Sequence, residues 1–206
     1  MDDLIRLLAS ENRALLGQVR ELVMRMSPQL YARRMEDLAC GSMGQQVRHV
    51  VSYYDAFLRA SSTVDYDKRE RQQAMENSPA LAVGRLTETA ELLTNWAEGS
   101  RPPDRRITVR ESCIKDLVWV TTELPSSLAR ELAFLGSHTV HHMAIMAMLA
   151  RGVGVQPAAD FGVAKATRQY LEDSLTGLRK DSGPGLRSAL RVDSWGSADP
   201  RNDRAG

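Results

Sequence analysis

The chain has 206 residues, of which 43% are hydrophobic, and its 27 basic side chains nearly balance its 26 acidic ones. This length suits a single domain with or without a tail. The near-neutral charge provides no global positive field that would favour nucleic acid as a partner. Charge or histidine interrupts the longest apolar stretches, so we expect no membrane-spanning segment.

Two local features bear on location. The first residues, Met1-Asp2-Asp3, lack the basic and apolar regions of a signal peptide. The two cysteines, Cys40 and Cys113, share no CxxC motif and stand in unrelated contexts. We therefore expect a cytoplasmic protein with reduced thiols, and no motif supports the alternative of a nucleophilic or metal-binding cysteine.

Residues 3–26 have the pattern of a long helix that ends at Ser27-Pro28. Its apolar stripe repeats every three or four residues and consists of Leu4, Leu8, Leu15, Val19, Leu22 and Met26. Glu11 and Asn12 interrupt the stripe near its middle. We expect them to turn to its edge and reach water, and the alternative is a polar group required inside the bundle.

Residues 28–41 are predicted to connect the first helix to a second, which runs to about Arg59. Ser42 and Gln45 have the spacing of a capping box at its start. The aliphatic stripe of this helix consists of Val47, Val50, Val51, Tyr54 and Leu58. His49 lies on the flank, so it is buried only if the helix packs between two neighbours, as in a four-helix bundle.

A polar segment, 61–78, is predicted to be a solvated loop with at most a helical turn. Ser78 and Pro79 then suit the N-cap and first position of a third helix. The apolar side of this helix consists of Leu81, Leu86, Ala90, Leu92, Leu93 and Trp96, and Gly99 ends it.

The helical pattern breaks between residues 100 and 122, where two short β-branched runs, 107–109 and 117–121, predict a small hairpin. Pro125 is predicted to open a fourth helix that runs to about Arg151, and a shorter helix is expected at about 162–178. Gly, Pro, Ser, Asp and Arg dominate the remaining residues, so 1–178 form the predicted helical domain and 179–206 a flexible tail.

The fourth helix carries three of the four histidines. Positions at 100° intervals share one face, which consists of Glu131, Leu135, His138, His142, Ile145 and Leu149. His138 and His142 are one turn apart in the centre of this predicted core-facing stripe, a spacing from which two imidazoles can hold one metal ion. The alternative is a pair of core histidines bonded to each other or to carboxylates, while His141 falls on another flank with a packing or supporting role.

Four features together resemble the DinB/YfiT-like family of four-helix-bundle metalloproteins. They are Ser42-Met43-Gly44-Gln45-Gln46-Val47-Arg48-His49-Val50 with Tyr53-Tyr54-Asp55; Arg130-Glu131-Leu132 before Ser137-His138-Thr139-Val140-His141-His142-Met143-Ala144; Asp160-Phe161-Gly162-Val163-Ala164; and Thr167. The resemblance covers about Leu4 to Leu178. It implies an all-α four-helix bundle, here with a small β-hairpin insertion and an extra C-terminal helix.

The resemblance also implies three metal ligands: His49 from the second helix, and His138 and His142 from the long later helix. Three neutral ligands leave an open position for water or substrate. Such an ion can act as a Lewis acid, lower the pKa of bound water, or activate a thiolate. Imidazole ligands favour Zn²⁺ or Ni²⁺, with Fe²⁺ as an alternative.

Two further residues are candidates for a catalytic role. Glu131 lies two turns before His138 on the same face, where it could accept a proton or a hydrogen bond; the alternative is an ion pair with Arg130 or Arg48. Tyr53 could line the pocket and donate to a bound substrate, or it could be an ordinary, partly buried tyrosine.

These candidate residues are compatible with three hypotheses for the function of the protein. The leading hypothesis is a metal-dependent transferase or hydrolase that acts on a small molecule, with a low-molecular-weight thiol as cosubstrate. The second is a non-catalytic metal-binding or stress-associated protein, in which the metal stabilises the bundle. The third is an adaptor whose tail beyond Lys180 binds a partner. A homodimer is also expected, because helical bundles readily pair through their faces.

Overall fold

The computed structural model describes residues 2–35, 41–98 and 104–181. The chain forms two compact units, residues 1–164 and 165–206, and each is described by itself. The described part is mostly helical and includes a small three-stranded sheet. Cys40, Gly99 and the tail from 182 onward lie outside these residues, so the predictions made for them stay predictions. So does the proposed domain boundary between residues 178 and 179.

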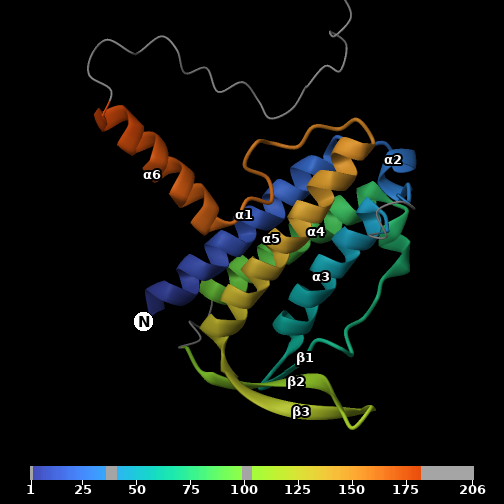
Figure 1. Cartoon of the computed structure of the whole chain (residues 1–206). Helices are drawn as coiled ribbons and strands as arrows, with labels where there is room; N and C mark the ends of the chain where they lie inside the picture. Colours follow the sequence, from blue (N-terminus) through green and yellow to red (C-terminus); the bar gives the residue numbers. More distant parts are fainter. Residues whose placement is uncertain (1, 36–40, 99–103, 182–206) are drawn as a thin grey trace, which may run out of the picture. The chain divides into compact units, whose positions relative to one another are not determined.

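Four long helices make up most of the first unit: α1 (Asp2–Met24), α3 (Met43–Arg59), α4 (Pro79–Glu98) and α5 (Leu128–Gly152). Both α1 and α3 pack against α4 and α5 (Figure 1). Two short elements, α2 (Pro28–Ala32) and the 3₁₀ turn η2 (Gln73–Glu76), lie in the connections, and the second unit contains α6 (Lys165–Asp181). The predicted helices are therefore present, with α2 as an addition.

Local hydrogen bonds set the starts of α3 and α4. The Ser42 hydroxyl accepts from the Gln45 amide at 3.2 Å, and the Gln45 side chain accepts from the Ser42 amide at 3.1 Å, which confirms the capping box. Ser78 likewise caps α4 by accepting from the Leu81 amide at 3.2 Å. Gly44, in the first turn of α3, allows the backbone of η2 to approach so closely that any side chain there would collide with the carbonyl of Glu76.

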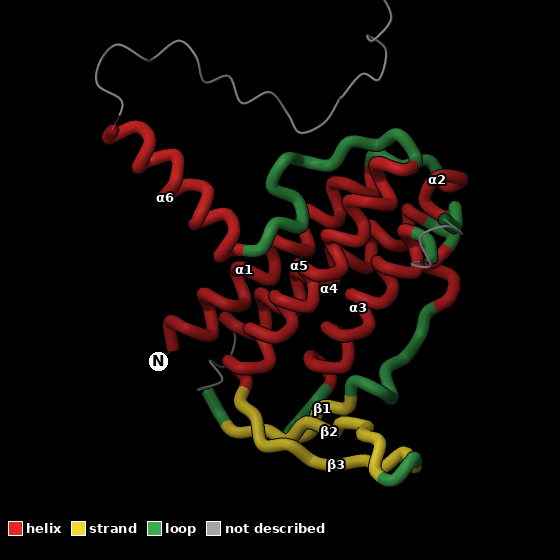
Figure 2. The backbone as a smooth tube through the Cα atoms, in the orientation of Figure 1, coloured by secondary structure: helices red, strands yellow, loops and turns green. Residues whose placement is uncertain are grey.

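The sheet lies at one end of the four long helices (Figure 2). It has the order β1 (Thr63–Asp65), β2 (Arg106–Lys115), β3 (Val118–Ser127), with β1 parallel to β2 and β2 antiparallel to β3. The predicted hairpin is confirmed but is longer than its two apolar runs indicate. The β1 strand was missed, because three residues in a charged segment give too short a pattern.

The start of α5 corrects the sequence analysis. Pro125 does not open the helix; it lies in β3, opposite Thr108 of β2. Since β3 is the outer strand of the sheet, a residue without an amide hydrogen is tolerated there. The helix begins three residues later at Leu128, and the Ser127 hydroxyl caps it by accepting from the Arg130 amide.

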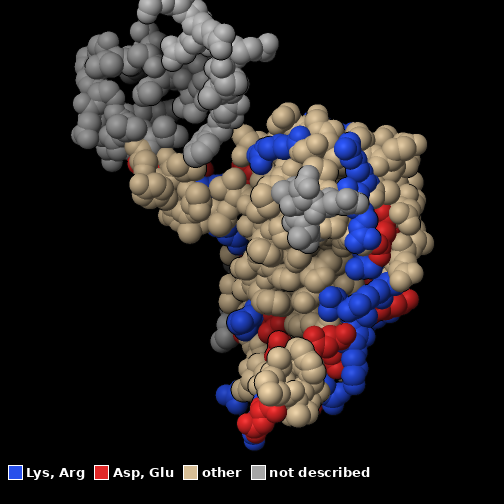
Figure 3. All heavy atoms as spheres, turned by 45° about the vertical axis from the view of Figure 1, so that its right-hand side comes forward, with Lys and Arg blue, Asp and Glu red and all other residues tan. Residues whose placement is uncertain are grey.

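The hairpin presents large apolar side chains to solvent. They are Ile114, Leu117, Val118 and Trp119, together with the free thiol of Cys113. In Figure 3 the hairpin lies at the foot of the molecule, where an uncharged surface is bordered by acidic and basic residues. The two turn residues, Asp116 and Leu117, have φ of 52° and 65°, as a tight two-residue hairpin turn requires.

The interior of the first unit contradicts one prediction for the first helix. Asn12 does not turn to water; it is 1% exposed. Its amide donates to the carbonyls of Leu8 (2.7 Å) and Leu132 (3.0 Å), and its oxygen accepts from the Tyr54 hydroxyl at 2.6 Å. Tyr54 in turn lies 2.9 Å from the hydroxyl of Thr139. This buried network joins α1, α3 and α5, so the alternative interpretation, a polar group required inside, is the correct one.

The buried face of α1 includes most of the predicted stripe but is broader. Leu15, Val19, Leu22 and Met26 are buried as predicted. Leu4 is 45% exposed, and the buried face also includes Ile5, Ala9, Leu16 and Val23. The reason is that α1 contacts two helices, α4 and α5, so its buried face is broader than a single stripe.

By length and composition alone, the most apolar helix, α5, could cross a membrane. The core helix of a soluble protein meets the same two criteria. No membrane-spanning segment was predicted from the sequence, because histidines interrupt the apolar run of this helix. In the protein, 44% of its most apolar window is buried, and its buried side packs against α1 and α3.

Breaking the buried network is predicted to destabilise the protein. Asn12→Ala leaves the Tyr54 hydroxyl and the Leu132 carbonyl without this partner, and we expect the free energy of unfolding to fall by about 1–3 kcal/mol. Chemical denaturation measures this loss, and Arg13→Ala, on the exposed side of α1, serves as the control. In a cycle with Tyr54→Phe, the double variant should lose less than the two single variants together; strictly additive losses would contradict the network.

Candidate metal site

Three histidines from two helices meet on one side of the first unit. His49 comes from α3, and His138 and His142 come from successive turns of α5. One side-chain nitrogen from each lies within 4.8 Å of the others. The Nε2 atoms of His49 and His138 are 3.0 Å apart, and the centroid of the His49 ring is 4.3 Å from that of His142. The packing of α3 against α5 thus brings together the residues that the resemblance indicated.

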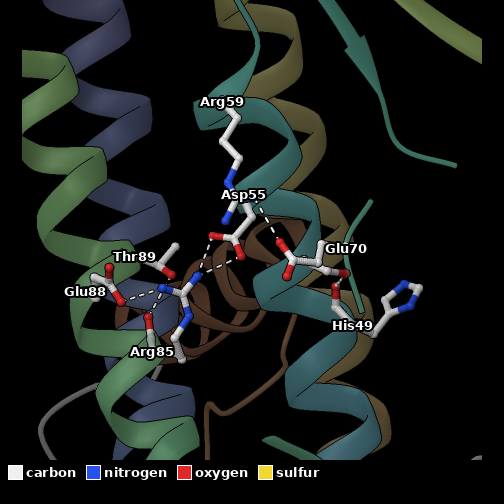
Figure 4. Close-up of polar contacts among 8 residues, drawn as sticks. His49, Asp55, Arg59, Glu70, Arg85, Glu88 and Thr89 are labelled. Atoms are coloured by element: carbon white, nitrogen blue, oxygen red, sulfur yellow. Dashed lines mark hydrogen bonds and ion pairs between the residues drawn. The ribbon is translucent and has the colours of Figure 1, made fainter. Parts of the chain in front are cut away.

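The flank position of His49 was predicted correctly, and its burial follows from its neighbours. Figure 4 shows Asp55 turned toward Arg85 of α4, while His49 leaves α3 on the opposite side. The Asp55 carboxylate accepts from Arg85 through both oxygens, at 2.8 and 2.9 Å. Because this ion pair faces α4, the flank that carries His49 is directed to α5.

The prediction that His138 and His142 occupy the centre of the core-facing stripe is wrong. Both are half-buried. The centre of the buried face is formed instead by Leu132, Leu135, Thr139, Met143 and Met146. The face is rotated because α5 packs on α1 as well as on α3. The two imidazoles therefore lie at the border of the core, where each keeps some contact with solvent.

The geometry of the cluster suits a metal ion. Two nitrogens bound to one zinc ion at 2.0–2.1 Å in tetrahedral geometry would be separated by about 3.3 Å. The His49 and His138 nitrogens, 3.0 Å apart, are already close to that separation. Three neutral imidazoles with no carboxylate in the cluster are a donor set that suits Zn²⁺, Ni²⁺ or Fe²⁺ better than Mg²⁺ or Ca²⁺.

The orientation of His142 depends on Gln46, a residue to which the sequence analysis gave no role. The Gln46 side-chain oxygen lies 2.7 Å from Nδ1 of His142. An Nδ1–H that donates to this oxygen leaves the lone pair on Nε2, where a metal could use it. The signal was present in the sequence, because Gln46 shares the flank of α3 with His49.

Burial and neighbouring positive charge keep the three imidazoles neutral. Burial lowers the pKa of His49 to about 3, and His142 and Arg69 add to the shift. Burial also lowers the pKa of His138 and that of His142 to about 4, with His141 contributing to both. Neutral imidazole is the form that binds metal, so burial favours the protonation state that a metal ligand needs.

Aromatic side chains form one wall of the cluster. The Tyr53 ring lies 4.2 Å from that of His138 and 4.8 Å from that of His49. Tyr66 stacks on Tyr53 at 5.0 Å, and Phe134 stacks on His138 at 5.5 Å. Tyr53 is therefore next to the cluster, as its predicted role requires. Tyr66 was missed because it lies in the segment predicted to be a solvated loop, where a lone aromatic residue is the only sign of burial.

Glu131 is 4% exposed and lies beyond this wall. Its carboxylate accepts hydrogen bonds from the hydroxyls of Tyr66 (2.8 Å) and Ser126. Burial and this carboxylate raise the pKa of Tyr66. Arg130 approaches Glu131 only to 3.9 Å from an exposed position, whereas Arg48 pairs with Glu76 instead. A cavity of about 170 Å³ between α5 and the hairpin is lined by Tyr66, Glu131 and Phe134 among others.

The other histidine and the methionines of α5 differ in how far they are exposed to solvent. His141 is exposed, and its ring meets that of His142 edge-on at 5.2 Å. Met143 and Met146 fill the core as predicted, but Met148 is 50% exposed.

Gly162, with φ of 72°, lets the loop after α5 approach so closely that a side chain would collide with the backbone of Met143 and Ala144.

Comparison with known proteins identifies one family. The model of the DinB family matches residues 1–173, a range that includes all three clustered histidines. No curated protein and no solved structure matches the chain.

The lowered pKa values of the three clustered histidines predict that acid destabilises the metal-free protein. Between the ordinary pKa of 6.5 and about 4, the unfolded chain binds more protons than the folded one. The free energy of unfolding should therefore be highest above pH 6.5 and fall as the pH falls through this window. Chemical denaturation of chelator-treated protein at a series of pH values measures the slope.

The matched variants for this prediction are His49→Gln/His138→Gln/His142→Gln, which should flatten the slope, and His141→Gln, which leaves the clustered rings in place and should preserve most of it. An equally steep slope in the triple variant would show that other groups cause the acid sensitivity.

Proposed function

The chain belongs to the DinB family, and from this membership we propose that His49, His138 and His142 bind one divalent metal ion. The observation that carries the proposal is the convergence of three imidazole nitrogens from α3 and α5. We further propose that α1, α3, α4 and α5 constitute a four-helix bundle of the kind expected for the family, because each pair of neighbours in such a bundle is in contact here.

Zn²⁺ and Ni²⁺ are the proposed metals, with Fe²⁺ as the alternative. Three protein ligands leave at least one coordination position open, and a metal bound there would supply Lewis acidity, a bound water of lowered pKa, or a site for a thiolate. The half-buried position of the three rings supports this choice over a sealed structural site, because small molecules can reach such a position from solvent.

The residues around the cluster take distinct roles in this proposal. Gln46 holds His142 with Nε2 toward the cluster. Tyr53 packs against two of the rings, and its hydroxyl is the proposed donor to a bound substrate. Glu131 does not touch the cluster itself: it accepts a hydrogen bond from the hydroxyl of Tyr66, which stacks on Tyr53. In this arrangement Glu131 orients the aromatic wall and could accept a proton relayed through Tyr66.

The proposed reaction is a transfer or hydrolysis on a small molecule, with a low-molecular-weight thiol as cosubstrate. A thiolate is a soft ligand that an imidazole-bound metal can bind and activate, which supports the thiol in this role. The alternative is a non-catalytic protein in which the metal only stabilises the helices. Turnover of an electrophile that requires both metal and thiol would favour the enzyme.

Metal analysis of protein purified without an affinity tag tests the site. We expect about one equivalent of Zn²⁺ or Ni²⁺ per chain in the wild type, and a melting temperature that rises with metal, because binding to the folded state alone stabilises it. His49→Ala, His138→Ala and His142→Ala should each lose most of the metal. His141→Ala is the matched control and should retain it. Stoichiometric metal in the variant lacking all three clustered histidines would contradict the assignment.

The role of Gln46 is tested separately. Gln46→Leu removes the acceptor for the Nδ1–H of His142, and metal affinity should fall by about 10- to 100-fold, as is usual for a lost hydrogen bond behind a histidine ligand. Gln46→Glu is the control, since it keeps an acceptor oxygen at the same position. Competition with a chromophoric chelator measures both. Equal losses in the two variants would indicate that Gln46 acts through packing.

A further inference from the structure

Arg69 lies beside the histidine cluster, although it comes from the segment that the sequence analysis predicted to be a solvated loop. Its guanidinium carbon is 4.5 Å from the centre of the Tyr53 ring. Its Nη2 atom is 3.3 Å from Nδ1 of His49, and its Nε atom donates to the Ser52 hydroxyl at 3.1 Å. The third nitrogen, Nη1, donates to the carbonyl of Tyr66. The guanidinium is thus held against α3 in a definite orientation.

Among the described residues, the charge of Arg69 lacks an acidic partner. Neighbouring arginines are paired: Arg48 with Glu76, Arg59 with Glu70 and Arg85 with Asp55. Over the ranges 2–35, 41–98 and 104–181, by contrast, no carboxylate forms an ion pair with Arg69. A half-buried guanidinium usually has such a partner, because loss of hydration must be offset. An unpaired guanidinium beside the histidine cluster is a ready binding site for an anion.

The position of the ring proton on His49 connects Arg69 to metal binding. An arginine can only donate, so Nδ1 of His49 is the acceptor and the ring proton is on Nε2, which faces Nε2 of His138. A metal ligand at Nε2 requires the proton to be on Nδ1 instead. Two N–H groups would then face each other across 3.3 Å. Metal binding at Nε2 therefore releases Arg69 from His49.

We propose that Arg69 is the anion-binding residue of this site, and that it recognises the carboxylate or phosphate group of a small-molecule ligand. The inference rests on the proposed metal site and gives the chemical class of its substrate. A divalent ion held by the three neutral imidazoles would add its positive charge to that of the neighbouring guanidinium. The Nη2 donor released from His49 lies on the Nδ1 side of that ring, where it can donate to an anionic group of a ligand bound beside the cluster.

A purely structural role is the competing explanation. The bonds from Arg69 to Ser52 and to the Tyr66 carbonyl could serve only to attach the loop to α3. Such a role predicts that substitution lowers thermal stability and leaves ligand affinity unchanged. An anion-binding role predicts a loss of anion affinity at constant metal content. It also predicts that substitution of Arg69 leaves metal affinity unchanged or raises it. The substitution removes a positive charge that repels the metal, and it removes the hydrogen bond to His49.

The test is calorimetric titration of the full chain, loaded with Zn²⁺, with propionate and, separately, with inorganic phosphate. Arg69→Met should weaken binding of the recognised anion by about 10- to 100-fold, as loss of a charge-assisted hydrogen bond does. Arg69→Lys keeps the charge without the planar fork and should fall between wild type and Arg69→Met. Preference for propionate or for phosphate identifies which oxyanion the site takes.

Arg59→Met is the matched control, since it changes net charge equally and removes an arginine from the exposed end of α3. Metal content and melting temperature are measured for every variant. An Arg69→Met protein that holds its metal and binds both anions as the wild type does would overturn the inference and leave the metal proposal intact. Failure of the wild type to hold metal would refute the metal proposal instead. If that metal-free wild type binds an anion and Arg69→Met does not, the anion-binding role of Arg69 is still supported. Absence of anion binding in the wild type, with and without metal, would refute that role.

Discussion

The contact between α3 and α5 depends on a buried polar network, and the site depends on that contact. Tyr54 of α3 bonds Asn12 of α1 and approaches Thr139 of α5, all three in the core. Hydrogen bonds tolerate much less displacement than apolar contacts, so this network sets the register of the three helices. His138 is next to Thr139 in sequence, and His49 is five residues before Tyr54. The same register that satisfies the network therefore brings the two imidazoles together.

The border position of the histidines satisfies two requirements that a metal site open to ligands would have. Burial lowers the pKa of each ring, which keeps the nitrogens neutral and able to bind metal. Partial exposure leaves a path for a ligand from solvent. A location in the centre of the buried face, as periodicity alone predicted, would have met the first requirement and not the second. The rings of Tyr53, Tyr66 and Phe134 add an apolar side to the cluster.

The loop between β1 and η2 contributes more to the site than its composition indicates. It is rich in charge, and most of its side chains are exposed, yet Tyr66 and Arg69 turn inward against Tyr53. The connection from Tyr66 to Glu131 ties this loop to the start of α5. Residues from α3, α5 and the loop thus form the environment of the cluster. Within the described part of the chain, Arg69 of this loop is the only cationic residue that hydrogen-bonds to a clustered histidine.

The sequence by itself determined the features that depend on residues a few positions apart. Ser42 and Gln45 placed the start of α3, and the four-residue interval placed His138 and His142 on one side of α5, because capping and helical period are local properties. The resemblance added His49. Only the tertiary structure decided that Asn12 is buried, that the histidines lie at the border of the core, and that Arg69 faces them. Periodicity gives the angle at which a side chain leaves its helix, but which neighbour occupies that angle depends on packing between segments distant in the sequence.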